Sequence, residues 1–145
     1  MTKQAILCVD DEAIIVMSLS QEIRSHFHDR FIYETALSAE EAFSIIDELT
    51  KEGIRLIMVI SDWLMPGMKG DEFLSVVRQT HPDTKTLLVT GHAPREVIEK
   101  MKDDAIVNAI LIKPWTTAGL IKAISEVVDA PQNENTSGEP SGEIR

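Results

Sequence analysis

The sequence predicts a single α/β domain, built as a doubly wound, five-stranded parallel sheet with helices on both faces. Two observations predict it. Five short apolar segments alternate with segments of helical period, and polar side chains follow four of the apolar segments directly. Crossovers between such strands are right-handed, so the expected strand order is 2-1-3-4-5. A chain of 145 residues has the length of one domain with a substantial core.

The predicted strands are short, continuous apolar runs, as expected for strands buried on both faces. They cover residues 5–9, 30–36, 54–61, 86–90 and 108–112. Helices are predicted from about residue 12 to 26, after Ser38, around Phe73 and Val77, over residues 94–103, and around Leu120 and Ile124. Ser38 and Glu41 form a capping-box pattern, Gly53 is suited to end that helix, and Pro94 suits a first turn.

The composition changes after Ala130. Residues 131–145 are mostly Pro, Gly, Ser, Asn and Glu, and such a segment cannot bury enough apolar surface to offset the entropy of ordering it. We therefore expect one folded domain over residues 1–130 and a disordered tail or linker over residues 131–145.

Charge and hydropathy exclude two classes of partner. A net charge of −10 argues against direct nucleic-acid binding, which needs a basic surface. No apolar run is long enough to span a bilayer, and the first residues lack a signal-peptide pattern, so we expect no membrane insertion and a cytoplasmic location. The single cysteine, Cys8, lies inside the first apolar strand and is expected to be a small buried hydrophobe.

Four predicted strands end in residues suited to phosphoryl chemistry. Asp10 and Asp11 follow the first strand, Asp62 the third, Thr90 ends the fourth, and Lys113 follows the fifth. The carboxyl ends of parallel strands form the ligand crevice of such a sheet. A carboxylate that attacks a phosphoryl group must overcome repulsion between anions, and a divalent cation reduces that repulsion. The three carboxylates suit Mg²⁺, while the ammonium and the hydroxyl can bind phosphoryl oxygens.

In this order and spacing, the motifs resemble the receiver domain of bacterial two-component response regulators, over roughly residues 4–129. The resemblance implies a flavodoxin-like fold and a cis peptide bond between Lys113 and Pro114. It also implies the following site: Mg²⁺ or Mn²⁺ bound by Asp10, Asp11, Asp62 and the backbone carbonyl of Leu64, with Asp62 as the phosphoacceptor and Thr90 and Lys113 beside the phosphoryl group.

The function implied by the resemblance is a phosphorylation-controlled binding switch. A sensor histidine kinase or a histidine phosphotransfer protein would donate the phosphoryl group, and an unidentified downstream protein would bind in response. Such a domain is a regulatory phosphoacceptor, not an enzyme, and its own chemistry is limited to self-phosphorylation and autodephosphorylation. The chain would be a stand-alone regulator, a phosphorelay intermediate or part of a longer protein, and dimerisation on phosphorylation is left open.

The sequence departs from the family pattern at Ile110, where the family often has Tyr or Phe. We expect a switch or output face that includes Ile110, Pro114 and Trp115, without the aromatic half of the usual switch. Trp115 suits a core position and an exposed docking position equally well. Leu64 offers no polar side chain to orient water, so slow autodephosphorylation is expected.

Two other functions remain to be weighed. A degenerate receiver could act as a constitutive adaptor, although all five site residues are intact. A metal-dependent phosphatase could also work through an aspartyl phosphate, but the pattern D-x-D-x-T is absent after the first strand. His26 and His28 are expected to lie on the surface without a metal. His92 is expected near the mouth of the site.

Overall fold

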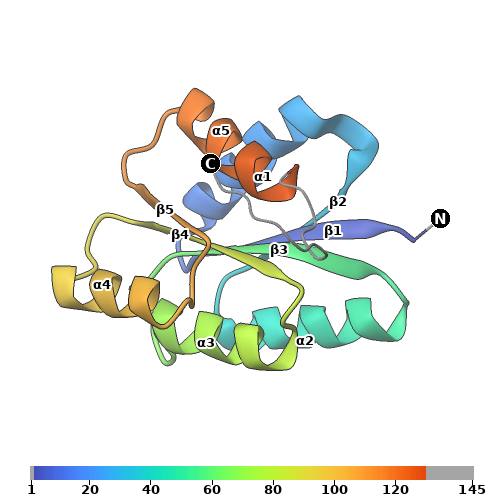
Figure 1. The fold of residues 1–145 in the computed structure, drawn as a ribbon. Helices are drawn as coiled ribbons and strands as arrows, with labels where there is room; N and C mark the ends of the chain where they lie inside the picture. The colour runs from blue at the N-terminus through green and yellow to red at the C-terminus, as the bar shows by residue number, and fades with distance from the viewer. Residues whose placement is uncertain (1, 130–145) are drawn as a thin grey trace, which may run out of the picture.

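The computed structural model describes residues 2–129, and it shows a five-stranded parallel sheet between two layers of helices (Figure 1). The strands are β1 (Gln4–Val9), β2 (Ile32–Ala36), β3 (Arg55–Ser61), β4 (Lys85–Thr90) and β5 (Ala109–Ile112). Their order is β2-β1-β3-β4-β5, so the predicted doubly wound fold is confirmed. The predicted tail, residues 131–145, lies outside the described residues.

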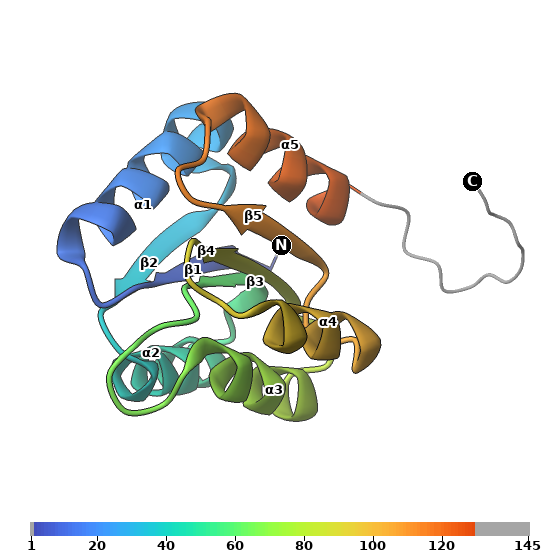
Figure 2. The ribbon, with the colours of Figure 1, turned by 90° about the vertical axis from the view of Figure 1, so that its left-hand side faces the viewer.

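Each crossover between strands contains a helix. The helices are α1 (Ala13–Phe27), α2 (Ala39–Lys51), α3 (Gly70–Thr80), α4 (Arg95–Asp103) and α5 (Thr117–Val128), with a short 3₁₀ helix, η1 (His28–Arg30), after α1. Helices α1 and α5 cover one face of the sheet, and α2, α3 and α4 cover the other (Figures 1 and 2). No helix within residues 2–129 is long and apolar enough to cross a membrane.

Two hydrophobic clusters fill the space between the sheet and its helices. Alternate residues of the central strands β1 and β3 point to opposite faces, so each strand contributes to both clusters. Phe73 anchors the cluster under α2 and α3, and Ile23 and Leu120 anchor the cluster under α1 and α5. Cys8 is buried in the second cluster as expected, and burial raises the pKa of its thiol to about 12.

The signals predicted at the ends of α2 are confirmed, and the starts of α4 and β2 differ slightly from the prediction. The hydroxyl of Ser38 accepts a hydrogen bond from the backbone of Glu41 at 3.0 Å, which confirms the cap of α2. Gly53, two residues after α2, has a φ of 73°, a conformation that glycine adopts at little steric cost. Pro94 precedes the first turn of α4 instead of lying within it. The second strand starts at Ile32, not at residue 30, because η1 occupies the preceding residues.

All five strands run in the same direction, so the loops after them meet at one edge of the sheet. The backbone N–H of Asp62 donates to the carbonyl of Val9 at 3.0 Å, and that of Lys113 donates to the carbonyl of Thr90 at 3.1 Å. These bonds continue the pairing of neighbouring strands one residue beyond the sheet. Figure 2 views the molecule from the side on which these loops lie.

Candidate functional site

The structure brings together the three acidic residues that the sequence singles out. Asp10 and Asp62 are buried, with 1% and 6% of their surface exposed, whereas Asp11 is exposed. One carboxylate oxygen from each lies within 4.8 Å of the others. Within residues 2–129 this is the only group of three or more acidic, His or Cys side chains close enough to share a metal ion.

Asp10 is held by the backbone on both sides. Its N–H donates to the carbonyl of Ala36 at 3.1 Å, which extends the pairing of β1 with β2. Its Oδ1 accepts from the N–H of Glu12 at 2.9 Å, at the start of α1. The remaining oxygen, Oδ2, therefore faces the site.

Asp62 lies at the start of a tightly folded loop. Its Oδ1 accepts from the N–H of Trp63 at 2.8 Å, and the indole of Trp63 donates to Asp71 on α3 at 2.9 Å. The loop closes where the N–H of Gly70 donates to the carbonyl of Trp63 at 2.7 Å. A Cβ at Gly70 would lie 2.7 Å from the Cα of Trp63 and would also collide with the backbone of Asp62, so only glycine fits here.

Lys113 joins the two buried carboxylates. Its Nζ lies 3.0 Å from Oδ2 of Asp10 and 3.4 Å from Oδ2 of Asp62, and 16% of its side chain is exposed. Burial acts to lower the pKa of this ammonium, but the hydrogen bond to Asp10 and the two negative charges outweigh it. The pKa of Lys113 is therefore above its ordinary value, and the side chain is a permanent cation at neutral pH.

The pKa of Asp62 is raised above its ordinary value. Burial is the largest cause, and the negative charge of Asp10 adds to it. The charge of Lys113 and the hydrogen bond from Trp63 oppose the rise without cancelling it. The Asp62 carboxylate is therefore poorly compensated, and a further cation beside it would lower its energy.

These groups border a hollow that is open to solvent. Its lining comes from the loops after β1, β3, β4 and β5: Asp11, Glu12, Asp62, Leu64, Met65, Pro66, His92 and Lys113. The carboxylates of Asp10, Asp11 and Asp62 outnumber the single ammonium of Lys113, so the site has an excess of negative charge. Oxygen donors in this number suit a small divalent cation such as Mg²⁺, which keeps several of its waters when bound to protein. The residues present therefore fit the metal that the sequence implied.

Thr90 lies next to the site without bordering the hollow. It is 1% exposed, and its hydroxyl accepts a hydrogen bond from the N–H of His92 at 3.2 Å. It pairs with Ile112 in the sheet, directly before Lys113. His92 lines the hollow, as expected from its position two residues after Thr90.

The residues expected to form one switch face are separated in the structure. Ile110 packs against the cluster on the α2 and α3 side of the sheet, whereas Trp115 packs against the cluster on the α1 and α5 side. The indole of Trp115 is partly buried and donates to Glu22 of α1 at 3.0 Å. Pro114 follows a cis peptide bond with Lys113, as the resemblance implied. The switch face formed by these three residues therefore stays a prediction.

Sequence reasoning missed the contacts that link this site to the helices. The bonds from Trp63 to Asp71 and from Trp115 to Glu22 join residues that lie 8 and 93 positions apart. Asp71 and Glu22 look like ordinary acidic residues of a helix surface, and no local pattern distinguishes them. His26 and His28 are exposed, in agreement with their predicted surface position.

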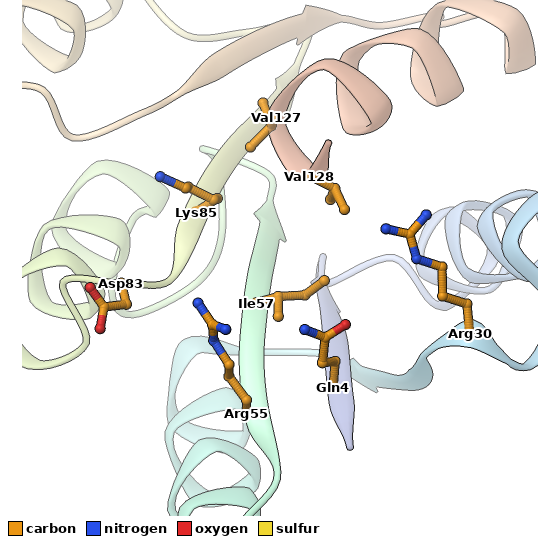
Figure 3. Close-up of a pocket in the computed structure, with 8 residues that line it drawn as sticks. All are labelled: Gln4, Arg30, Arg55, Ile57, Asp83, Lys85, Val127 and Val128. Atoms are coloured by element: carbon orange, nitrogen blue, oxygen red, sulfur yellow. The ribbon is translucent and has the colours of Figure 1, made fainter. Parts of the chain in front are cut away.

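A second hollow lies at the opposite edge of the sheet, where the strands begin (Figure 3). Its basic side chains, Arg30, Arg55 and Lys85, do not converge. Arg30 and Lys85 lie on opposite sides, and the ammonium of Lys85 points away from the other two (Figure 3). Arg30 is already paired with Asp129 at 3.0 Å. This hollow therefore has no set of groups aimed at one ligand.

Comparison with known proteins agrees with the site at the carboxyl ends of the strands. The profile of the response regulator receiver domain matches residues 6–125, and the chain belongs to this family. It is a phosphoacceptor domain of two-component signalling, with a regulatory role.

Several relatives carry such a domain within longer proteins. The chain is 32% identical over 130 residues to the hydrogenase transcriptional regulatory protein HoxA of Cupriavidus necator and 32% identical over 124 residues to the sensor kinase CckA of Brucella abortus. These matches cover 88% and 86% of the chain but only 25% and 12% of the relatives. The chain thus spans a quarter or less of both proteins.

Other relatives are of similar length to the chain. A chemotaxis protein CheY homolog of Campylobacter jejuni is 29% identical over 136 residues, which cover 91% of the chain and 98% of the relative. A CheY-like response regulator receiver domain from Methanospirillum hungatei superposes with a TM-score of 0.75 at 28% identity, over 89% of the chain and 95% of that structure. The predicted family and fold are both confirmed.

Proposed function

We propose that Asp62 is the phosphoacceptor, that Asp10 and Asp11 hold a divalent cation with it, and that Lys113 binds the transferred group. The observation that carries this proposal is the position of the Lys113 ammonium, within 3.4 Å of two buried carboxylates at the edge of a solvent-exposed hollow. Burial raises the pKa of Asp62, so this carboxylate gains from a new cationic environment.

The proposed step is an in-line transfer. An oxygen of Asp62 attacks phosphorus, the new O–P bond forms, and the bond from phosphorus to the donor breaks. With a phosphohistidine donor, the imidazole nitrogen leaves with the electron pair of the P–N bond and later takes a proton from water. Lys113 releases its contact with Asp62 and pairs with an oxygen of the phosphoryl group, whose charge exceeds that of the carboxylate.

Mg²⁺ or Mn²⁺ held by Asp10, Asp11 and Asp62 would reduce the repulsion between the attacking carboxylate and the phosphoryl oxygens. Leu64 borders the same hollow, and we propose its backbone carbonyl as a further ligand. Asp11 is the most exposed of the three acids and is free to reorient toward the cation.

We propose that Thr90 transmits the change of state. Its hydroxyl accepts only the weak 3.2 Å bond from His92, so rotation toward a new phosphoryl oxygen has a small cost. Ile110 lies on the neighbouring strand and packs toward α4. In this chain, displacement of Thr90 is accommodated by an aliphatic side chain, without the rotation of an aromatic ring.

The proposed phosphodonor is a histidine kinase or a histidine phosphotransfer protein that docks over the hollow. Ile14 and Met17 are 80% and 65% exposed and lie one turn apart on α1, just after Asp11. Leu64 is 46% exposed on the other side of the hollow. Exposed apolar side chains on both sides of a charged site suit a protein partner that covers the reacting atoms.

The proposed role of α1 in docking the phosphodonor protein can be tested with two phosphodonors. Met17→Asp should slow transfer from a phosphorylated histidine phosphotransfer domain and leave phosphorylation by acetyl phosphate unchanged. Equal rates for wild type and variant with the protein donor would remove α1 from the docking surface.

For the output, we propose that phosphorylation changes the surface around β5, an edge strand whose Ile112 is 57% exposed. This surface would bind a downstream protein or a second copy of the chain. Light scattering with and without beryllofluoride, which mimics the phosphoryl group, tests self-association. Family membership and the proposed kinase partner both favour a cytoplasmic location. We also propose that residues 1–130 form the receiver domain.

The principal test is intact mass after incubation with acetyl phosphate and Mg²⁺. We expect one added phosphoryl group in the wild type, and none after chelation of the metal or in Asp62→Asn. Asp83→Asn is the matched control, because Asp83 lines the hollow at the opposite edge of the sheet. An adduct that persists in Asp62→Asn would refute the assignment of the phosphoacceptor.

The alternatives have less support. A constitutive adaptor has no need for a buried pair of carboxylates with a raised pKa at Asp62. A phosphatase would turn over a small phosphate ester, whereas a phosphoacceptor retains the phosphoryl group. Release of inorganic phosphate in catalytic amounts from such an ester would therefore favour the phosphatase.

A further inference from the structure

A group of hydrogen bonds joins α1 to the loop that carries Lys113. Oε1 of Glu22 accepts from the indole of Trp115 at 3.0 Å and from the hydroxyl of Thr117 at 2.8 Å. Oε2 of Glu22 accepts from the hydroxyl of Ser18 at 3.1 Å. These four residues, Ser18, Glu22, Trp115 and Thr117, are called the Glu22 cluster below.

Glu22 is partly buried and forms no salt bridge within residues 2–129. Its charge is stabilised by three neutral donors, and hydrogen bonds to a carboxylate are about twice as strong as those between neutral groups. One donor, Trp115, lies in the loop after β5, another, Thr117, is the first residue of α5, and both bind the same oxygen. The carboxylate therefore fixes the position of that loop relative to α1.

Trp115 packs against the hydrophobic cluster under α1 and α5, and its hydrogen bond to Glu22 adds a direct link to α1. A groove separates α1 from the loop, and its lining includes Ile15 and Glu22 on one side and Lys113 and Pro114 on the other. The neighbouring hydroxyl of Thr116 is used within its own helix, where it accepts from the N–H of Gly119 at 3.0 Å. Within residues 2–129, the side-chain hydrogen bonds from Trp115 and from Thr117 to α1 both end on Glu22.

We propose that Glu22 is a positioning residue for Lys113. The backbone of Lys113 is fixed on one side by its bond to Thr90 and, two residues later, by the bond from Trp115 to Glu22. Between these two points, the ammonium must reach both Asp10 and Asp62. Glu22 does not contact the phosphoryl group itself. It keeps the loop in the position from which Lys113 contacts that group. This inference rests on the proposed role of Lys113 in phosphoryl binding.

The test compares Glu22→Ala with Glu22→Gln. The amide oxygen of Gln can accept the bonds from Trp115 and Thr117, and its NH₂ can donate to the hydroxyl of Ser18, so this variant keeps the geometry and loses only the charge. We expect Glu22→Ala to slow phosphorylation by acetyl phosphate about tenfold, since a misplacement of about 1 Å can reduce a rate on the order of 100-fold. Glu22→Gln should retain nearly the wild-type rate.

A second readout separates positioning from general loss of structure. The proposed Mg²⁺ ligands follow β1 and β3, and displacement of the Lys113 ammonium, 3.0 Å from Asp10, would remove a competing cation from them, so Mg²⁺ affinity should not fall in Glu22→Ala. In a Trp63→Phe background, the emission of Trp115 should shift to the red in Glu22→Ala and stay unchanged in Glu22→Gln, because only the first variant releases the indole.

Three results would overturn the proposal. They are a wild-type rate in Glu22→Ala, an equal loss of rate in both variants, and a parallel fall of rate, Mg²⁺ affinity and thermal stability. The two levels of inference remain distinguishable. The rate of the wild type tests the proposed function, and the ratio of variant to wild type, together with the emission of Trp115, tests Glu22.

Discussion

Replacement of Asp62 by asparagine should stabilise the fold in the absence of metal. At an effective dielectric constant of about 20, the attraction between Asp62 and Lys113 at 3.4 Å is about 5 kcal/mol. Under the same conditions, the repulsion between Asp62 and Asp10, whose oxygens lie within 4.8 Å, is at least about 3.5 kcal/mol. The exposed Asp11 adds roughly 1 kcal/mol of repulsion through water. Attraction and repulsion nearly cancel.

The cost of burying the Asp62 charge then decides the outcome, in agreement with the raised pKa of this carboxyl, for which burial is the largest cause. An Asn side chain keeps the bond from the N–H of Trp63 and avoids that cost. We expect Asp62→Asn to raise the free energy of unfolding by about 1–2 kcal/mol at pH 7, the size seen for relief of an unsatisfied buried polar group.

The gain in unfolding free energy of Asp62→Asn should depend on pH in a defined direction. Because the pKa of Asp62 is higher in the folded chain, folding favours the neutral acid, and the penalty is fully present only above that raised pKa. The advantage of Asp62→Asn should therefore shrink as the pH falls through the folded pKa and vanish below the ordinary value of 3.8. Mg²⁺ should also reduce it, since bound metal stabilises the wild type more than the variant.

Urea denaturation followed by circular dichroism, with EDTA and then with Mg²⁺, measures these differences. Asp47→Asn is a suitable control, because Asp47 is exposed and paired only with Lys51, so its loss should change stability by less than about 0.5 kcal/mol. If Asp62→Asn were less stable than the wild type in EDTA at pH 7, the reasoning that burial outweighs the Lys113 attraction would be refuted.

Four further variants are informative. Lys113→Met leaves two buried carboxylates without their cation and should lower the free energy of unfolding by about 3 kcal/mol in urea titrations. Gly70→Ala places a Cβ against the backbone of Asp62, so we expect a lower Tm and loss of phosphorylation in the same sample. Ser38→Ala removes the cap of α2 and should cost about 1 kcal/mol in the same titration, without effect on phosphorylation. Leu64→Asn offers a polar group to orient water, so the phosphorylated form should decay faster than that of the wild type when followed by intact mass.

The fold was predictable because its strands and helices have distinct periods and its turns carry local signals. The buried runs of β1 and β3, the cap at Ser38 and the glycine at position 53 each act within a few residues. The errors lie where a local signal is weak. Residues 28–30 form a 3₁₀ helix, so β2 begins two residues later than predicted. The hydroxyl of Tyr33 donates to the carbonyl of His28 in this helix, and no sequence pattern predicts that bond.

The candidate site was predictable to the extent that strand ends define it. Parallel strands bring Asp10, Asp62 and Lys113 to one edge whatever the details of the loops. The bridging position of the Lys113 ammonium and the bonds of Glu22 to the loop depend on side-chain directions and on how α1 packs against the sheet. Such contacts between distant residues leave no periodic trace, and for this reason the sequence does not decide between a core and an exposed position for Trp115.

The most direct test of the account is to locate the phosphoryl group within the chain. After phosphorylation with acetyl phosphate and Mg²⁺, borohydride converts an aspartyl phosphate to homoserine, and peptide mass spectrometry then identifies the modified residue. The account predicts homoserine at position 62 and at no other aspartate. Modification at Asp10 or Asp11 with an intact Asp62 would contradict it.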